Sequence, residues 1–390
     1  MGYEIYGLRG NPFPKGLAIL NPESPDPREN GSIFSVNARA KEIEEFEGKF
    51  VGTKTALDDR YRCGLLWAEG DNRSGRGMGK TALSIYIKHR VNDEYGKNYF
   101  GGKEKFFCSY ISFREEIKSK IAFLYKEALR SFINEGLFLH ISSCVSKDNL
   151  VKAGVSEDFA EAVANNSVKD YLESLSKYRL EEMSTAYDQR FLLKLPDLFL
   201  NQTVRCLKAA GFEGGILLID DIERLTDRST RKEIENFIKD FRIAFFSTGN
   251  EASNSNFFTI ILTTHLQSSQ KISEAWSVAG LGTAIPLVAG GHASVLTRKP
   301  DMKHCIDIIT QHLKYYRDPA FTHPDEFYPF KKEAIETVIR DCDFHPRRFL
   351  SRFNRIITEA LSKDVKEITS EFVRTVPEVE EEEPLGIEEL

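Results

Sequence analysis

The chain has 390 residues, 41% of them hydrophobic, which is enough for one large core and a smaller module. No apolar run approaches the length of a bilayer span and no signal-peptide core opens the chain, so we expect a cytoplasmic protein with no membrane partner. Six scattered cysteines, without a Cys-x-x-Cys pair or a neighbouring His cluster, argue against a zinc site and against a disulfide framework.

The net charge of −6 comes from the C-terminal tail. Seven glutamates lie in residues 377–390, and the −6 of the whole chain less these seven charges leaves the body near +1. The acidity therefore neither excludes nor supplies a basic surface for nucleic acid.

The first 52 residues are expected to form an arm and a linker helix. The arm is rich in Pro, Gly and Asn, and we expect it to be extended and held in place by an aromatic residue such as Phe13. Apolar residues with helical spacing follow at about 37–52.

Residues 74–81 carry the most informative pattern of the chain. They lie between an apolar run at 64–68, which predicts a buried strand, and helically spaced apolar residues at 82–87. Glycines between a strand and a helix N-terminus let the backbone N–H groups curl around phosphate. We expect Lys80 to reach the β- and γ-phosphates and the Thr81 hydroxyl to bind Mg²⁺. The candidate phosphate-binding residues are Ser74, Gly75, Arg76, Gly77, Met78, Gly79, Lys80 and Thr81.

A long helical stretch follows the second predicted strand, which is expected at 106–112. Roughly a hundred residues separate this strand from the next one, and their apolar spacing is helical. Because that interval is too long for one crossover, we expect a helical insertion at about 138–190.

Residues 216–221, Ile-Leu-Leu-Ile-Asp-Asp, form a second informative pattern. Four aliphatic residues followed by acid predict a buried parallel strand whose carboxylates emerge at its C-terminal edge. Asp220 would then hold the Mg²⁺ shell, usually through water, and Asp221 would orient an attacking water. The alternative is a core strand with a solvated acidic turn, but the glycine-rich loop upstream favours a nucleoside-triphosphate site. ATP is the default, because no Asn-Lys-x-Asp-like element for guanine ends a strand.

The C-terminal part is predicted to be mainly helical. A further buried strand is expected at 257–262, whereas residues 276–297 have no clear pattern. Helical spacing predicts a lid over residues 299–366, and the acidic residues 367–390 are expected to be disordered. With about 26 residues after the last lid helix, we expect no winged-helix DNA-binding domain there.

Strands separated by helices, with the glycine-rich loop after the first strand, predict an α/β fold. We expect a P-loop NTPase core at residues 53–298, with a parallel sheet covered by helices on both faces.

The chain resembles the AAA+ superfamily of P-loop ATPases, and its layout is closest to the initiator-type and transposition-regulator ATPases of archaea and bacteria. Residues 74–81 resemble the Walker A motif of that family, with Ser74 where the general phosphate-loop pattern begins with Gly, and residues 216–221 resemble Walker B. Residues 344–350, Phe-His-Pro-Arg-Arg-Phe-Leu, resemble the lid element that carries sensor 2. In this family a linker packs near adenine. The N-terminal arm resembles that linker in the residues Asn11-Pro12-Phe13, Phe34, Arg39 and Glu42.

The resemblance implies roles for further residues. Thr264, favoured over Thr263, would be the polar sensor that contacts the γ-phosphate or the attacking water. Arg347 would report whether ATP or ADP is bound, and Ser112 lies where the family often has an Asn that restrains the catalytic acid. The implied catalytic residues are Asp221, Thr264 and Arg347, the implied metal ligands are Thr81 and Asp220, and the cofactors are ATP and Mg²⁺.

Two departures from the family predict slow hydrolysis. Many of these ATPases have Glu where this chain has Asp221, although Glu223 could assist. Residues 266–297, where an arginine finger often occurs, contain no Arg. The open candidates for a finger are Arg224, Arg228, Arg231 and Arg242.

Three functions follow from these observations. The first is a nucleotide-dependent regulatory factor that assembles as a homo-oligomer on double-stranded DNA, through lysines such as Lys118 with Lys120, or Lys147 with Lys152. The second is a signalling or defence-type nucleotide switch that binds a protein partner through the helical insertion, without DNA. The third is a protein-remodelling motor, which ranks last because no pore loop is evident after the second strand.

Overall fold

The computed structural model describes most of the chain, and the predicted site residues Ser74 and Gly75 lie outside the described part. The described residues are 2–15, 24–51, 62–69, 76–93, 105–113, 121–176, 178–179, 189–246, 257–282 and 287–377.

The chain divides into two compact units. The first, called the helical unit below, comprises residues 1–40, 77–86 and 298–390. The second, called the sheet unit, comprises residues 41–76 and 87–297.

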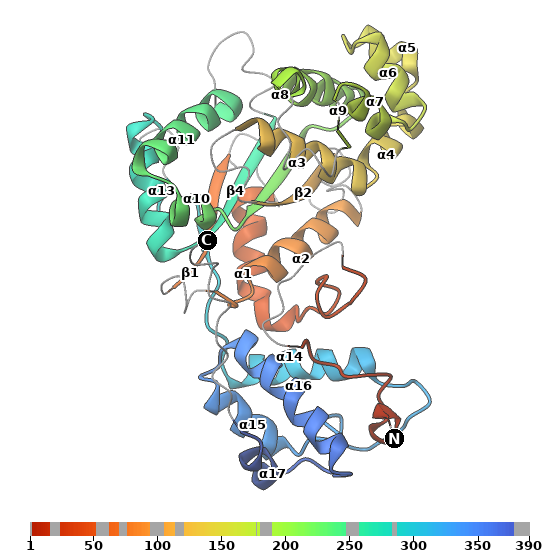
Figure 1. Ribbon diagram of the computed structural model, residues 1–390, viewed down its shortest axis with the longest axis vertical. Coiled ribbons are helices and arrows are strands. Elements are labelled where there is room, and N and C mark those ends of the chain that lie inside the picture. The colour runs from red at the N-terminus through yellow and green to blue at the C-terminus, as the bar shows by residue number, and fades with distance from the viewer. Residues whose placement is uncertain are drawn as a thin grey trace. The chain divides into compact units, whose positions relative to one another are not determined.

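A five-stranded, all-parallel sheet forms the centre of the sheet unit (Figure 1), which confirms the predicted α/β class. The strand order is β2-β3-β4-β1-β5. The strands are β1 (Cys63–Ala68), β2 (Phe106–Ser112), β3 (Gly214–Asp220), β4 (Phe258–His265) and β5 (Ser294–Leu296).

The apolar runs of the sequence explain the central strands. Every residue of β1, β3 and β4 is buried, as expected for parallel strands that are covered on both faces. Two glycines open β3 because phenylalanines lie opposite them: a Cβ atom on Gly214 would lie 2.4 Å from the Phe106 ring, and one on Gly215 would lie 2.5 Å from the Phe107 ring.

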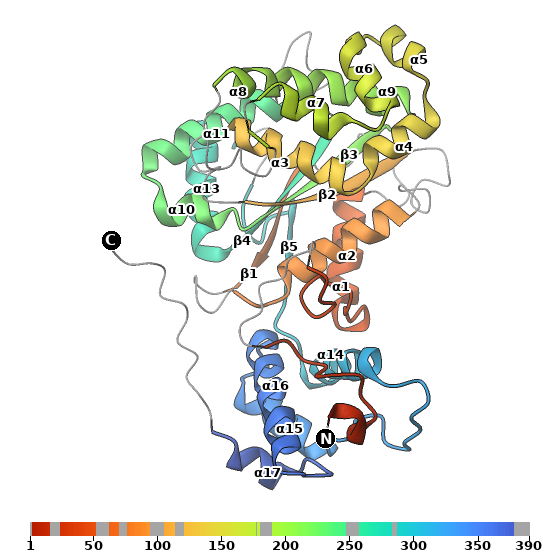
Figure 2. The ribbon, with the colours of Figure 1, turned by 45° about the vertical axis from the view of Figure 1, so that its right-hand side comes forward.

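Helices cover the sheet on two sides (Figure 2). On one face, α3, α8, α11 and α13 share a continuous apolar core with Phe107, Leu217 and Leu262 of the strands. On the other face, the turn after α1 places Phe50 against Gly64 of β1. The helices are α1 (Ala40–Phe46), followed by a π-helical turn at Glu47–Val51, α2 (Lys80–Asp93), α3 (Ile121–Asn134), α8 (Gln189–Pro196), followed by a π-helical turn at Asp197–Thr203, α9 (Val204–Ala209), α10 (Glu223–Arg228), α11 (Arg231–Phe246) and α13 (Leu266–Val278).

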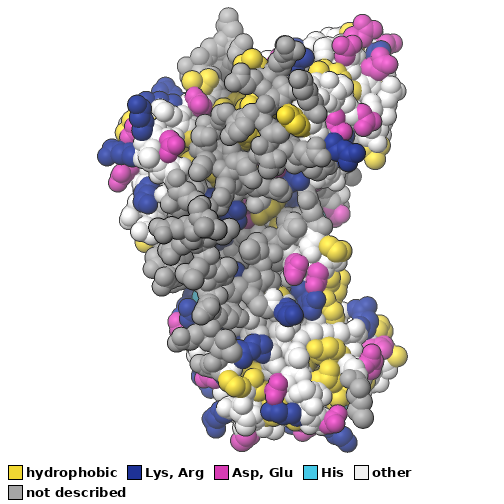
Figure 3. Space-filling model, in the orientation of Figure 1, with side chains coloured by type: hydrophobic (Ala, Val, Ile, Leu, Met, Phe, Trp, Pro, Cys, Tyr) yellow, Lys and Arg dark blue, Asp and Glu magenta, His cyan; other side chains and the backbone are white. Residues whose placement is uncertain are grey.

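Four short helices occupy the predicted insertion. Its charged side chains are mostly acidic: residues 137–176 contain six acidic residues and three lysines. On the face drawn in Figure 3, acidic side chains gather over α5 and α6. The four helices are α4 (Leu137–Cys144), α5 (Lys147–Lys152), α6 (Glu157–Ala164) and α7 (Val168–Ser174).

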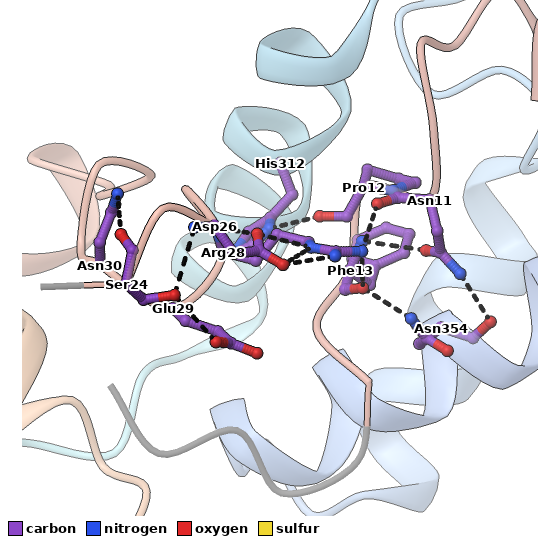
Figure 4. Close-up of polar contacts among 10 residues, drawn as sticks. All are labelled: Asn11, Pro12, Phe13, Ser24, Asp26, Arg28, Glu29, Asn30, His312 and Asn354. Atoms are coloured by element: carbon purple, nitrogen blue, oxygen red, sulfur yellow. Dashed lines mark hydrogen bonds and ion pairs between the residues drawn. The ribbon is translucent and has the colours of Figure 1, made fainter. Parts of the chain in front are cut away.

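The N-terminal arm packs against the C-terminal helices within the helical unit. Phe13 is fully buried between His312 and Phe353, and both rings stack on it. The side chain of Asn354 donates a hydrogen bond to the carbonyl of Phe13 at 2.6 Å (Figure 4). The unit contains short 3-10 helices at Tyr3–Tyr6 and Asn37–Arg39, together with α14 (Met302–Tyr316), α15 (Lys332–Asp341), α16 (Pro346–Ser362) and α17 (Ser370–Thr375).

One expectation for the C-terminal half needs correction, and one stretch without a clear pattern can be assigned. The prediction that residues 367–390 are disordered is wrong for 367–377, because α17 forms there and Ile368 and Val373 are fully buried; residues 378–390 lie outside the described part. The unclassified stretch 276–297 contains the end of α13 and the short strand β5, which pairs with β1.

None of the helices in the described part of the chain combines the length and the apolar character that a bilayer crossing requires.

Candidate functional site

The strand order brings the predicted acidic and polar residues of the sheet unit to one edge of the sheet. β4 lies between β1 and β3, so the carboxyl ends of these three strands are neighbours. Leu66 pairs with Thr263, and Ile219 pairs with Leu262, which places Thr263 beside Asp220. The glycine-rich segment follows β1 in the chain.

Asp220 is a buried carboxylate, and three neutral donors of the described part of the chain hydrogen-bond to it. Only 1% of the Asp220 residue is exposed to solvent. Oδ1 accepts hydrogen bonds from the Thr263 hydroxyl and, at 3.0 Å, from the N–H of Asp221. Oδ2 accepts a hydrogen bond from the Tyr110 hydroxyl at 2.7 Å. These bonds offset the cost of burying the carboxylate and fix its orientation at the end of β3.

Asp221 has different surroundings, although it follows directly in the chain. Its φ of +58° is in the left-handed region, which few residues other than Gly adopt, and Asp is among those that do. Its N–H lies within hydrogen-bond distance of both Asp220 Oδ1 and the Thr263 hydroxyl, at 3.1 Å from the latter. Its partly exposed carboxylate forms an ion pair with Arg224, with 3.0 Å between Oδ2 and Nη2.

Thr263, not the favoured sensor candidate Thr264, is the threonine of β4 that contacts Asp220. The hydroxyl of Thr263 donates to Asp220, whereas that of Thr264 lies 3.2 Å from the carbonyl oxygen of His265. Successive side chains on a strand point to opposite faces, and Thr264 pairs with Trp67 on the face that carries the large apolar core. The structure therefore brings Thr263, not Thr264, together with the acidic pair.

Tyr110 is a site residue that the sequence analysis missed. Ser112 is the residue of β2 that pairs with Asp220, yet the hydroxyl that reaches Asp220 Oδ2 belongs to Tyr110, two residues earlier on the same face. Burial and the neighbouring Asp220 raise the pKa of Tyr110 well above its ordinary value, so its hydroxyl keeps its proton at neutral pH. Only the register between β2 and β3 could have revealed this contact.

Residues 77–81 of the glycine-rich loop belong to the helical unit, and Arg76 belongs to the sheet unit. Gly77 and Gly79 have φ values of +77° and +91°, so both adopt the left-handed conformation that a side chain disfavours. α2 begins at Lys80, which is 7% exposed, and Thr81 follows in its first turn. The carbonyl of Gly79 accepts the first bond of the helix, from Leu83 at 2.9 Å.

Two arginines of the helical unit lie against this loop. Arg347 lies in the first turn of α16 and is close to Gly77: a Cβ atom added to Gly77 would lie 2.6 Å from the Cβ atom of Arg347. Arg39 is 4% exposed, and its guanidinium donates to the carbonyls of Met78, at 2.6 Å, and of Arg298, at 2.7 Å. The predicted sensor Arg347 and the linker residue Arg39 thus both contact the predicted phosphate loop.

The candidates for an arginine finger differ in their contacts. Arg224 pairs with Asp221 of its own chain. Arg231 forms an ion pair with Glu235 on the surface of α11, and Arg242 donates to the carbonyl of Ala279. The side chain of Arg228 lies outside the described part.

Glu223 and two of the four lysines proposed to contact DNA can be placed. Glu223, which could assist Asp221, is only 2% exposed at the start of α10. Lys147 is held by Glu161 at 2.9 Å and by Glu157 at 3.8 Å, and Lys152 is exposed at the end of α5. Lys118 and Lys120 lie outside the described residues.

Comparisons with known proteins leave the family open. No protein-family model matches this sequence, and no characterised protein is significantly similar to it.

Proposed function

We propose that the protein binds Mg²⁺ and ATP at residues 74–81 and at the acidic end of β3, and that it hydrolyses ATP slowly as a regulatory ATPase of the AAA+ type. Lys80 would contact the β- and γ-phosphates, and Asp221 would orient the attacking water. Thr263 takes the sensor role that the resemblance gave to Thr264, and Arg347 would respond to the γ-phosphate.

One observation carries the proposal most directly. Asp220 is a buried acid at the carboxyl end of the parallel strand β3. Strand β1, which β4 separates from β3 in the sheet, is followed in the chain by the glycine-rich segment and by α2, which begins with Lys80 and Thr81. Ligands of open α/β sheets bind outside the carboxyl ends of the strands. A helix N-terminus that follows left-handed glycines favours an anion, because N–H groups and the helix dipole act together.

The donor set fits Mg²⁺. Asp220 and Thr81 offer oxygen atoms, which this cation prefers. Among the described residues, no group of three or more His, Cys, Asp or Glu side chains could hold a metal ion by itself. That suits Mg²⁺, which keeps several waters and binds through one or two carboxylates together with substrate phosphates. When bound, it would neutralise charge that develops on the phosphates.

The surroundings of Asp221 support slow turnover. Its carboxylate is engaged by Arg224, so accepting a proton from water requires this ion pair to rearrange. Asp is also shorter than the Glu that a fast ATPase of this type would carry. The protein is therefore proposed to act as a switch whose state depends on the bound nucleotide.

The base of the nucleotide is proposed to bind near the linker. Phe34 and Tyr86 of the helical unit stack with 4.5 Å between ring centroids, and Arg39 lies in the same unit. Tyr86 lies on α2, the helix that follows the glycine-rich loop, and this aromatic pair is suited to stack against a planar purine base.

The insertion favours a protein partner over DNA. Residues 138–190 contain nine acidic residues and six Lys or Arg, and Lys147 is already paired with acidic side chains. Phosphate backbones are bound by basic surfaces, which this one is not. Light scattering with Mg²⁺ and a slowly hydrolysed ATP analogue distinguishes these two functions. If the particle size does not change when duplex DNA is added, the result supports the protein-binding switch. If larger assemblies form only with DNA, the result supports the DNA-bound regulator.

Nucleotide binding to the full chain tests the proposal. Lys80→Ala is expected to weaken the binding of a fluorescent ATP analogue about tenfold or more, because it removes the charge that contacts two phosphates. Lys239→Ala, at an exposed position of α11, is the matched control and should bind as the parent does. A parent protein that binds no nucleoside triphosphate, or a Lys80→Ala variant that binds normally, contradicts the proposed site.

A further inference from the structure

The phenol of Tyr110 contacts the proposed metal-shell carboxylate from a strand that the sequence motifs do not include. Tyr110 lies on β2, which pairs in parallel with β3, and Ser112 and Asp220 are partners in that pairing. Residues 110 and 112 share one face of the strand with Asp220. The Tyr110 hydroxyl reaches diagonally along this face to Asp220 Oδ2, at 2.7 Å.

The two oxygens of Asp220 are thereby held from opposite sides. β4 supplies the Thr263 hydroxyl to Oδ1, the backbone of Asp221 adds an N–H at 3.0 Å, and β2 supplies the phenol to Oδ2. A carboxylate held on one oxygen only could rotate about its last bond. With donors on both oxygens, from both neighbouring strands, its plane is fixed by the sheet itself.

We infer that Tyr110 is a positioning residue for Mg²⁺: it fixes the plane of the Asp220 carboxylate in the orientation that the metal shell requires. The inference rests on the proposed function. Groups that hydrogen-bond to a metal-ligating carboxylate orient it, and their loss typically costs about 10–100-fold in metal affinity or activity. Tyr110 lies beyond the metal shell, so it is not expected to contact nucleotide.

A purely structural role makes a different prediction. If the phenol only satisfied a buried carboxylate, its removal would lower stability and leave the metal dependence unchanged. The decisive quantity is therefore the Mg²⁺ requirement of nucleotide binding, not activity or stability.

The test measures the affinity of the full chain for a fluorescent ATP analogue as Mg²⁺ is varied, and again with the metal chelated. In Tyr110→Phe, the Mg²⁺ concentration that gives half of the metal-dependent gain in affinity is expected to rise about tenfold or more. The affinity without metal should equal that of the parent. Tyr125→Phe is the matched control: Tyr125 is a buried tyrosine of the same unit that stacks on Phe199, and its variant should keep the parent's Mg²⁺ requirement.

Three outcomes distinguish the possibilities. A folded Tyr110→Phe protein with the parent's Mg²⁺ requirement overturns the inference while leaving the proposed function intact. A parent protein that binds no nucleotide, with or without metal, overturns the proposed function itself. Should Tyr110→Phe fail to fold, Tyr110→Met removes the same hydroxyl with a side chain that fills irregular space, and the same shift is expected.

Discussion

At the scale of single residues, two consecutive carboxylates at the end of β3 have acquired different surroundings. Asp220 is buried and bound by neutral donors, whereas Asp221 is partly exposed, left-handed and paired with Arg224. The turn at Asp221 separates them, because its positive φ points the chain away from the strand direction. One carboxylate is fixed, as its proposed role in a metal shell requires, and the other is placed where it can contact solvent.

The two threonines that follow each other on β4 provide a sharp test of the proposed chemistry. Thr263→Val removes the hydroxyl that donates to Asp220 and lies near the Asp221 N–H, and it is expected to lower ATP turnover roughly tenfold or more. Thr264→Val makes the same change on the opposite face and should leave turnover within about twofold of the parent, a range that ordinary surface or packing changes produce. Steady-state phosphate release measures both variants.

Nucleotide affinity at saturating Mg²⁺ is the control for that comparison, and it should stay unchanged in Thr263→Val. A larger loss of turnover in Thr264→Val than in Thr263→Val would return the sensor role to Thr264.

At the scale of elements, the strands could be predicted well from the sequence, because parallel strands buried on both faces consist of continuous runs of apolar residues. The expected strands at 64–68, 106–112 and 216–220 correspond to β1, β2 and β3. β5 escaped prediction, because three residues are too short to show a pattern. α17 escaped because it directly precedes the run of glutamates, which hid the buried contacts of its Val373 and of the preceding Ile368.

The details of the site depended on pairing, which no local pattern records. Whether Thr263 or Thr264 faces Asp220 is decided by the face that each residue occupies in the assembled sheet. The contact of Tyr110 requires both the register of β2 against β3 and the length of a phenol. Motifs could therefore identify the acidic strand and the loop, but not the residues that orient them.

The glycine-rich loop makes a prediction at the same scale. Gly77→Ala forces a side chain into a left-handed position and against Arg347 and His345, at 2.6 and 2.8 Å from the nearest atom of each. Gly211→Ala imposes similar backbone strain, with φ at +83°, but its Cβ would have no atom within 4 Å. Both variants should lose about 1–2 kcal/mol of stability, and only Gly77→Ala should also lose nucleotide affinity, about tenfold or more.

Denaturant unfolding and titration with a fluorescent ATP analogue measure these two effects separately. Equal nucleotide affinity in Gly77→Ala and Gly211→Ala would mean that the close approach of α16 to the loop has no role in binding.

At the scale of the whole chain, the N-terminal arm and the C-terminal helices form one unit although three hundred residues separate them. His312 of α14 is the polar contact at the centre of this packing: its Nδ1 lies 2.8 Å from the carbonyl oxygen of Pro12, and Phe13 stacks on its ring. Figure 4 shows this contact beside the Asp26–Arg28 ion pair, which holds the next part of the arm. The packing of the two chain ends therefore depends on a neutral, buried imidazole.

This dependence gives the helical unit a pH-sensitive stability. Burial lowers the pKa of His312 from 6.5 to about 4, and nearby Arg28 acts in the same direction. As the pH falls below about 6.5, His312 is protonated in the unfolded chain but stays neutral in the folded chain, so the free energy of unfolding decreases. The decrease continues to about pH 4 and reaches at most about 3 kcal/mol. Above pH 6.5 both states are neutral at this residue, and no contribution remains.

His312→Gln keeps a hydrogen-bond donor for Pro12 but cannot titrate. The variant is expected to be less stable than the parent at neutral pH, because it loses the stacking on Phe13, and to lose less stability between pH 6.5 and 4. Thermal unfolding followed by far-UV circular dichroism reports both units, whereas the fluorescence of Trp67 and Trp276 reports the sheet unit alone, so the difference between the two signals reports the helical unit. The Asp26–Arg28 pair does not interfere, because the pKa of Asp26 is lowered by Arg28 and its contribution is lost only as the pH falls further. Parallel pH profiles for parent and variant would show that folding does not lower the pKa of His312, and would contradict the buried, neutral imidazole on which the packing of the arm depends.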